Sequence, residues 1–366
     1  MKVLINVPEL DGPGGVAYYY RCLRPHFSSE TQYVAIGARS NERRAFHAMW
    51  RLLRDYANFL MKLSLESIDI VHLNPSLVPK AILRDAVFIM IAKVFRKKVV
   101  VFIRGWDPGF ERLIRRYFLT LFHLIYSRAD VFIVLSSEFQ RKLVEMGFNN
   151  PIYRETTVVA DSVLSRIDVR SQTERRQKGE KDFHILFLSR MERSKGIYLA
   201  LDAFRVLRDR NSKVAMTVAG DGREAASARE YARRNEIDGV EFVGHVDGDQ
   251  KHYAFSQADV YFFPTFHGEG MPNSVLEAMA YGLPIVTRPV GGIRDFFEDG
   301  KMGFVTESSS CTAFADLIET LMRNWELRSD MGCRGNRFVV ENCMASKVVT
   351  RLQAIYSTVL SEATPR

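Results

Sequence analysis

Two carboxylates eight positions apart, Glu269 and Glu277, flank the stretch of this sequence that is most informative about its chemistry. A Pro-Asn-Ser run between them, beginning at Pro272, predicts a turn that opens a short helix over residues 274–281. Backbone N–H groups at a helix N-terminus attract an anion, whereas carboxylates accept hydrogen bonds from hydroxyls. The stretch therefore suits a ligand that carries both phosphate and sugar hydroxyls.

Two cations could supply the positive charge that such a ligand needs. Arg190 and Lys195 follow an expected strand at 183–189 and precede an expected helix at 197–208. An arginine is a planar fork and a lysine a mobile point charge, so together they can bind one diphosphate and neutralise charge on a leaving group. The alternative is a pair of solvated loop cations.

Glycines follow several expected strands and would let the backbone approach a ligand closely. Gly14 and Gly15 come after the first strand, and Gly220 begins a Gly-Asp-Gly turn after a later one. A turn that merely connects strand and helix explains each of them as well. Neither half of the chain has a Gly-x-Gly-x-x-Gly fingerprint after a strand, which disfavours NAD-dependent chemistry.

Short apolar runs alternate with amphipathic stretches along the whole chain, which indicates βα units and parallel sheets. Because ligands of such sheets bind at the carboxyl ends of the strands, we expect two doubly wound, Rossmann-like domains that face each other across a cleft. The expected domains are residues 1–164 and 182–345, joined by a polar linker at 165–181, with a C-terminal helix at about 346–366 that returns to the first domain. The strands are predicted at 2–7, 32–36, 70–73, 99–103, 131–135 and 157–159, and at 183–189, 213–219, 240–243, 260–264, 284–287 and 303–305.

Composition is that of an ordinary globular protein, with 366 residues, 47% hydrophobic and 26% charged. Four cysteines without metal-like spacing predict reduced thiols, and no apolar run is long enough to span a bilayer. Residues 1–180 hold 28 Lys and Arg against 18 Asp and Glu, while the rest of the chain holds 23 against 25. This basic first half could attract an anionic membrane or acceptor, or it could be a solvated face without a partner.

At this point the sequence resembles a known family. The residues on which the resemblance rests are Arg190 and Lys195, the Gly-Asp-Gly turn at 220–222, the Glu-x7-Glu segment with Glu-Ala-Met-Ala-x-Gly-x-Pro, and the Gly-Gly pair at 291–292. Together they resemble the retaining nucleotide-sugar glycosyltransferases of family 4, glycosyl transferases group 1, which have the α/β GT-B fold. The resemblance spans essentially the whole chain and is most specific over residues 183–305.

The resemblance implies a role for each matching position. Arg190 and Lys195 would hold the donor diphosphate with help from the backbone of Gly14 and Gly15, and Glu277 would bind the ribose hydroxyls. Glu269 would contact the transferred sugar. Backbone amides in the stretch Met271, Pro272, Asn273 and Ser274 would face that sugar and the phosphates, and Gly220 would lie near the nucleotide. No metal and no cofactor are required.

One position departs from the family. Many relatives carry a histidine after the strand that corresponds to residues 99–103, and here Arg104 stands in its place. Arg104 could bind an anionic group, Trp106 could stack on a sugar ring and Asp107 could orient a hydroxyl; a structural Arg104–Asp107 pair is the alternative. His72, at the end of the preceding strand, could reach the ligand or serve packing.

The sequence thus predicts a cytoplasmic enzyme that moves a hexose from a nucleoside-diphosphate sugar to a glycan or lipid-linked acceptor in surface polysaccharide or lipopolysaccharide assembly, with no nucleic-acid partner. Attachment to the inner face of the cytoplasmic membrane would follow from the basic first half. Two alternatives stay open: a nucleotide-sugar epimerase or hydrolase of the same fold, and a non-catalytic sugar-nucleotide-binding subunit.

Overall fold

The chain forms two compact units. Unit 1 contains Met1–Ala160 and Met344–Arg366, and unit 2 contains Asp161–Cys343. The computed structural model describes residues 1–12, 14–37, 45–167, 182–266, 268 and 270–361, with the side chains of 45–48 left out. Most of the expected linker, residues 168–181, lies outside the described residues.

Unit 1 is built on a six-stranded parallel sheet in the order β2-β1-β3-β5-β7-β8. The strands are β1 Lys2–Val7, β2 Glu30–Ala35, β3 Ile70–Leu73, β5 Lys98–Ile103, β7 Val131–Val134 and β8 Ile152–Arg154. β4 (Ser76–Leu77) and β6 (Gly105–Trp106) form a separate two-stranded pair. The strand expected at 157–159 is wrong: the edge strand lies earlier, at β8, and Val159 makes only an isolated bridge to Met344.

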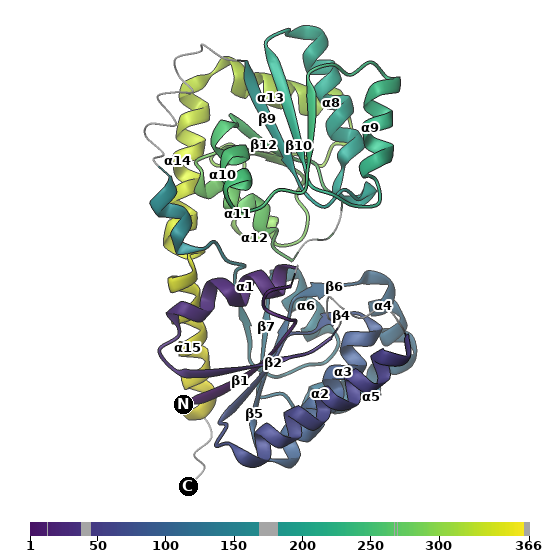
Figure 1. Ribbon diagram of the computed structural model, residues 1–366, viewed down its shortest axis with the longest axis vertical. Helices are drawn as coiled ribbons and strands as arrows, with labels where there is room; N and C mark the ends of the chain where they lie inside the picture. The colour runs from purple at the N-terminus through teal and green to yellow at the C-terminus, as the bar shows by residue number, and fades with distance from the viewer. Residues whose placement is uncertain (13, 38–44, 168–181, 267, 269, 362–366) are drawn as a thin grey trace. The chain divides into compact units, whose positions relative to one another are not determined.

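Helices cover both faces of this sheet. Figure 1 shows α1 and α15 on one side of it and α2, α3 and α5 on the other. The bounds are α1 Gly15–Leu23, α2 Ala45–Leu65, α3 Pro79–Val94, α4 Pro108–Leu113, α5 Leu119–Tyr126, α6 Ser137–Glu145 and α15 Ala345–Ser361. One turn of π-helix, η2 at Ile114–Phe118, joins α4 to α5. Strands covered on both faces need apolar side chains on both, which explains the nearly continuous apolar run of β5.

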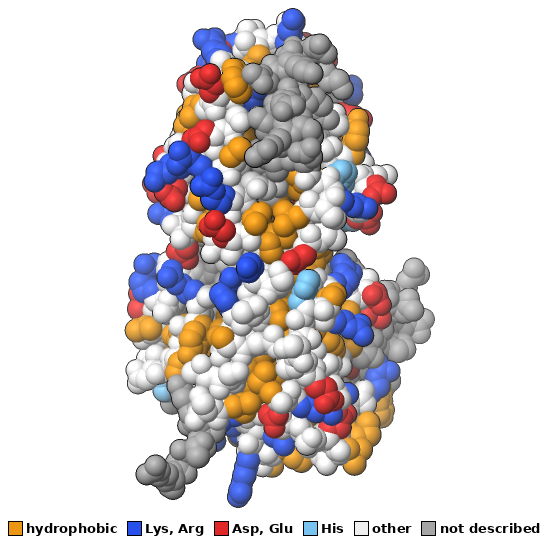
Figure 2. All heavy atoms as spheres, turned by 90° about the vertical axis from the view of Figure 1, so that its left-hand side faces the viewer, with side chains coloured by type: hydrophobic (Ala, Val, Ile, Leu, Met, Phe, Trp, Pro, Cys, Tyr) orange, Lys and Arg blue, Asp and Glu red, His pale blue; other side chains and the backbone are white. Residues whose placement is uncertain are grey.

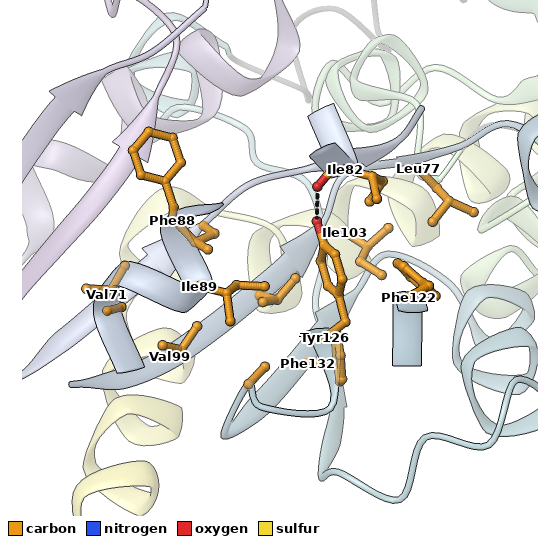
Figure 3. Close-up of a cluster of buried hydrophobic side chains, with 14 of the residues drawn as sticks. Val71, Leu77, Ile82, Phe88, Ile89, Val99, Ile103, Phe122, Tyr126 and Phe132 are labelled. Carbon is orange, nitrogen blue, oxygen red and sulfur yellow. Dashed lines mark hydrogen bonds between the residues drawn. The ribbon is translucent and has the colours of Figure 1, made fainter. Parts of the chain in front are cut away.

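The core of unit 1 lies between the sheet and these helices. Figure 3 shows part of it, with Phe88 and Ile89 of α3 and Phe122 and Tyr126 of α5 packed among strand residues. Tyr126 is buried, and its hydroxyl donates to the carbonyl oxygen of Ile82 at 2.8 Å. A buried phenol needs such a partner, so this bond fixes α5 against α3.

The last helix, α15, belongs to unit 1, although the whole of unit 2 separates it in sequence from the rest of unit 1. Arg351 holds the buried Glu155 through a forked pair of bonds at 2.6 and 3.0 Å. The phenol of Tyr356 reaches His72 at the centre of the sheet. The C-terminal helix therefore completes the core of unit 1.

Unit 2 has a second parallel sheet, in the order β11-β10-β9-β12-β13-β14. All six strands predicted for this half are confirmed: β9 Phe183–Leu188, β10 Val214–Ala219, β11 Val240–Gly244, β12 Val260–Phe263, β13 Ile285–Thr287 and β14 Gly303–Val305. The helices are α8 Ile197–Arg210, α9 Ala225–Arg234, α10 Gly248–Gln257, α11 Asn273–Ala280, α12 Ile293–Phe296, α13 Cys311–Arg323 and α14 Trp325–Asn342. Short 3-10 turns lie at η3 Asp161–Arg166 and η4 Arg193–Lys195 in this unit, and at η1 Arg24–His26 in unit 1.

Candidate functional site

The loop after β9 places the two predicted cations in different surroundings. The side chain of Arg190 is 70% exposed, with one contact at 3.3 Å to Glu192. Lys195 ends η4 and is only 6% exposed, so it is not a solvated loop cation. Burying an ammonium group costs free energy unless negative groups lie close to it. A phosphate bound beside Lys195 would supply that negative charge.

Close backbone contacts hold this loop against the end of β12. Gly196 has a φ of 82°, and a Cβ there would lie 2.1 Å from the carbonyl oxygen of Pro264. The N–H of Phe266 and the hydroxyl of Thr265 both donate to the carbonyl oxygen of Ser194, at 2.8 and 3.3 Å. The carboxyl ends of β9 and β12, which are neighbours in the sheet, are thereby joined into one rigid edge.

The Gly-Asp-Gly turn supports the same edge from the other side. A Cβ on Gly220 would lie 1.9 Å from the carbonyl oxygen of Ser189, and one on Gly222 would lie 2.5 Å from that of Met191. The N–H of Met191 donates to the carbonyl oxygen of Asp221 at 2.8 Å. These glycines are required because the turn packs directly on the loop that carries Arg190.

Glu277 lies inside α11, is 4% exposed and has a partner that the sequence did not reveal. Each of its carboxylate oxygens lies 2.6 Å from the ammonium of Lys251 in α10. A carboxylate oxygen has two lone pairs, so both oxygens can still accept from a diol. A buried glutamate signals that a cation must be nearby, but nothing in the sequence singles out Lys251 among the surrounding lysines and arginines.

Aromatic contacts reinforce this pairing of α10 with α11. Tyr281 stacks on Phe255 with ring centroids 5.1 Å apart, and its hydroxyl lies 2.8 Å from Nδ1 of His252. Burial, followed by the negative charge of Glu277, raises the pKa of Tyr281 to about 12, while Arg166 opposes the rise. The phenol thus stays neutral at physiological pH and keeps its hydrogen bond.

The N-terminus of α11 lacks a side-chain cap. Pro272 is the N-cap residue, and the helix starts at Asn273, one residue earlier than expected. Asn273 therefore does not cap, and its Oδ1 is buried without a hydrogen-bond partner among the described residues. Such an orphaned acceptor is costly unless a ligand donates to it. Glu269, the other predicted carboxylate, lies outside the described residues.

In unit 1, the glycines after β1 leave the backbone open. Gly14 is the N-cap residue of α1 with a φ of 118°, and a Cβ built on it would meet no atom within 4 Å. Gly15 is the first residue of the helix. Their backbone is thus accessible at a helix N-terminus, as an anion-binding role requires.

Arg104 is held as a preoriented cation. Its guanidinium carbon lies 3.9 Å from the ring centroid of Tyr19 and 4.2 Å from that of Phe102. One of its terminal nitrogens, Nη1, is buried without a hydrogen-bond partner among the described residues. Asp107 instead caps α4, accepting from the N–H of Phe110 at 2.6 Å, so no ion pair with Arg104 occurs in the described structure.

Two of the other candidates in unit 1 are structural: the ligand role expected for Trp106 is wrong, and for His72 the packing alternative applies. Trp106 belongs to the core, where it packs on Phe139 and donates its indole N–H to Glu111 at 2.6 Å, so it cannot stack on a sugar. His72 is fully buried between the hydroxyls of Tyr20 and Tyr356. Burial, with a smaller contribution from the charge of Arg104, lowers the pKa of His72 to about 3.

Comparison with known proteins identifies similar sequences. Residues 168–338 match the family described as glycosyl transferases group 1. The capsular polysaccharide biosynthesis glycosyltransferase CapM of Staphylococcus aureus is 29% identical over 50% of this chain. The N-acetyl-alpha-D-glucosaminyl L-malate synthase of Bacillus anthracis is 25% identical over 81% of this chain and 76% of its own length. The chain spans about half of the length of CapM, 48%.

The fold is shared with solved structures. HepE of Anabaena, crystallised with UDP and glucose, superimposes with a TM-score of 0.73 at 17% identity, covering 98% of this chain and 100% of HepE. The expected GT-B fold is confirmed by this likeness.

Proposed function

We propose that this chain, a GT-B protein whose residues 168–338 match the glycosyl transferases of group 1, moves a hexose from a nucleoside-diphosphate sugar to a glycan or lipid-linked acceptor. The observation that carries the proposal is the edge of the unit 2 sheet. There a buried lysine, an amide oxygen without a partner among the residues that the structure describes, and a lysine-bound carboxylate follow two neighbouring strands, β9 and β12. Relatives in capsular and colanic acid biosynthesis favour an acceptor in surface polysaccharide or lipopolysaccharide assembly.

Each group at this edge matches one part of the donor. Lys195 and Arg190 would hold the diphosphate, the first as a buried charge and the second as a fork that can fold onto the ligand. Glu277 would accept from the two ribose hydroxyls, with its orientation fixed by Lys251. Asn273 would accept from a hydroxyl of the transferred sugar or its neighbour through Oδ1.

We further propose that transfer retains the anomeric configuration. The bond between the anomeric carbon and the diphosphate oxygen breaks as the acceptor oxygen bonds on the same face, and the acceptor proton passes to the departing phosphate. Charge growing on that phosphate is stabilised by Arg190 and Lys195, so no metal is required. Glu269 is assigned to the sugar hydroxyls because the resemblance to the family 4 glycosyltransferases implies that role.

Recognition of the acceptor is assigned to unit 1. Arg104, whose buried Nη1 has no hydrogen-bond partner in the described part of the chain, suits an anionic group on the donor or the acceptor. The basic excess of the first half of the sequence suits a location at an anionic membrane surface, on the cytoplasmic side.

The test is a two-stage ligand and product experiment. Thermal shifts against UDP, GDP and ADP identify the nucleotide, because a ligand of the folded state raises the melting temperature by mass action. The matching nucleotide sugar is then incubated with acceptor extracts, and products are analysed. Release of nucleotide without a glycosylated product would refute transfer and favour a hydrolase, and an altered free sugar nucleotide would indicate an epimerase.

A variant separates the enzyme from a non-catalytic subunit. Glu277→Ala should remove turnover and, in cells, the surface glycan. Survival of the cellular role in that variant would indicate a binding subunit instead.

A further inference from the structure

The outward side of α3 is apolar from Leu83 to its end at Val94. Leu83, Val87, Met90 and Val94 recur at helical spacing and are exposed, Leu83 at 69% and Val94 at 76%. The opposite side of the helix packs into the core through Phe88 and Ile89. A surface helix normally has one apolar side, which packs on the core, and a polar side in water. α3 has an apolar side in each of these places.

The two neighbours of α3 repeat this pattern. α3 contacts both α2 and α5, and Figure 1 shows the three helices together. The exposed large apolar residues of α2 are Met49, Trp50, Leu53, Leu60, Met61 and Leu65. Those of the α4–η2–α5 segment are Leu113, Tyr117, Phe118, Leu121 and Leu124. These side chains with those of α3 are called the α2–α3–α5 face.

No comparable face exists in the described part of unit 2. Its exposed large apolar residues are scattered: Val243, Tyr253, Phe266 and Trp325. Single apolar residues on a surface need no explanation, whereas a contiguous patch marks an interaction site.

Basic residues predominate among the exposed charges around the α2–α3–α5 face, although Asp107 at the start of α4 and Glu145, which pairs with Arg115, are exposed as well. Exposed arginines border it at positions 54, 112, 116 and 128. The acidic residues within its described helices, Asp55, Asp85 and Glu111, are all buried. Asp85 is held by Arg84, and Glu111 by Trp106, Arg115 and Lys142. By contrast, the face drawn in Figure 2 carries side chains of both signs.

We propose that the α2–α3–α5 face inserts into an anionic lipid bilayer, with its apolar side chains at the acyl boundary and its arginines among the headgroups. Apolar area and basic charge together are what an interfacial helix needs, and each adds to binding. A second copy of the chain fits less well, because a two-fold interface would set this predominantly basic patch against itself. No described helix is both long and apolar enough to cross the bilayer.

The inference rests on the proposed location at a membrane and specifies how contact is made. Charge alone would hold the protein at the headgroups and would release it in salt. Insertion adds a salt-resistant part, because apolar burial does not depend on screening.

The experiment is co-sedimentation with phosphatidylcholine vesicles, with and without phosphatidylglycerol. The double variant Leu83→Gln/Val94→Gln is compared with a matched control in unit 2, Val243→Gln/Tyr253→Gln. We expect the first to bind anionic vesicles about ten-fold more weakly or worse than wild type, and the control to bind as wild type does. Because all four side chains are exposed, melting temperatures should stay unchanged.

Trp50 provides a second measurement, since it is 64% exposed on α2. Vesicles should shift the tryptophan emission of the wild type to the blue. Trp50→Phe should remove the shift, and Trp325→Phe in unit 2 should keep it.

Three results would overturn insertion: no binding to anionic vesicles, equal binding by the double variant and wild type, or a dimer of the free protein that the double variant abolishes. The last would identify a second copy as the occupant. Nucleotide-induced thermal shifts are recorded for every variant, so a failure of donor binding in unit 2 is seen separately.

Discussion

His72 and Tyr356 lie 284 positions apart in sequence, yet Nδ1 of the imidazole and the phenol oxygen are 2.6 Å apart. The neighbouring hydrogen bonds determine which of these atoms carries a proton. Tyr20 donates to Asn74, so it accepts from Nε2 of His72, which leaves Nδ1 to accept from Tyr356. A neutral imidazole is therefore built into the joint between α15 and the sheet of unit 1.

The first prediction concerns pH. The pKa of His72 is about 3 in the folded protein, well below its ordinary value near 6.5, so this group favours folding fully above pH 6.5 and progressively less as pH falls toward 3. We expect it alone to cost about 2 kcal/mol at pH 5. Denaturant unfolding between pH 7 and pH 5 should show a flatter pH dependence for His72→Phe than for wild type; equal slopes would contradict the prediction.

The second prediction concerns the buried ion pair. Lys251→Met leaves the carboxylate of Glu277 buried without its ammonium, which should cost about 3–5 kcal/mol of unfolding free energy. Adding Glu277→Gln should recover part of that stability but no transferase activity. Arg334→Met, in the exposed pair with Asp330, is the control and should change stability by less than about 1 kcal/mol.

A third prediction tests the close approach at Gly196. Gly196→Ala combines a positive φ with a Cβ placed against the carbonyl of Pro264. We expect it to lower the free energy of unfolding by more than about 3 kcal/mol and to abolish donor binding. Gly300→Ala has a similar φ of 73° with nothing within 4 Å, so about 1 kcal/mol is expected there. Thermal unfolding and nucleotide titration compare the two, and equal effects would mean that the contact is unimportant.

The fourth prediction concerns Arg104. Arg104→Lys keeps the charge but loses the fork and the stacking between Tyr19 and Phe102, so kcat/KM should fall about ten-fold or more, equivalent to about 1.4 kcal/mol. Arg229→Lys, whose arginine lies over Phe242 at 5.8 Å, controls for loss of a cation–π contact. Unchanged kinetics in Arg104→Lys would leave this arginine a structural role only.

The fifth prediction concerns metals. If Arg190 and Lys195 carry the diphosphate charge, turnover should persist after treatment with EDTA and dialysis. A loss of activity that Mg²⁺ or Mn²⁺ restores would refute the proposed metal independence.

The sequence was most informative where the chemistry is local. The strands of unit 2 and the positions of Lys195 and Glu277 follow from apolar runs, turn residues and spacing within short segments. Arg104 could be recognised as a departure, but not its stacking between two rings, because Tyr19 comes from α1.

Predictions failed where distant contacts decide. Trp106 follows a strand and looks available to a ligand, yet Phe139 and Glu111 hold it in the core. His72 is likewise bonded to Tyr356 of α15, near the end of the described chain, and Glu277 pairs with Lys251 of α10, a helix that carries no motif. Whether a polar side chain serves ligand or packing depends on neighbours that spacing along the chain does not reveal.

The bridge between Val159 and Met344 marks where the chain leaves unit 1 and where it returns. Unit 2 is therefore one continuous segment of the sequence, while unit 1 consists of two segments, one before it and one after it. During synthesis at about 5–20 residues per second, unit 1 waits roughly 10–40 s for α15 after its sheet has emerged. Unit 2 is fully synthesised before α15, so unit 2 can fold while unit 1 still lacks its last helix. A chaperone would therefore meet unit 1 with the position of Tyr356 still unfilled.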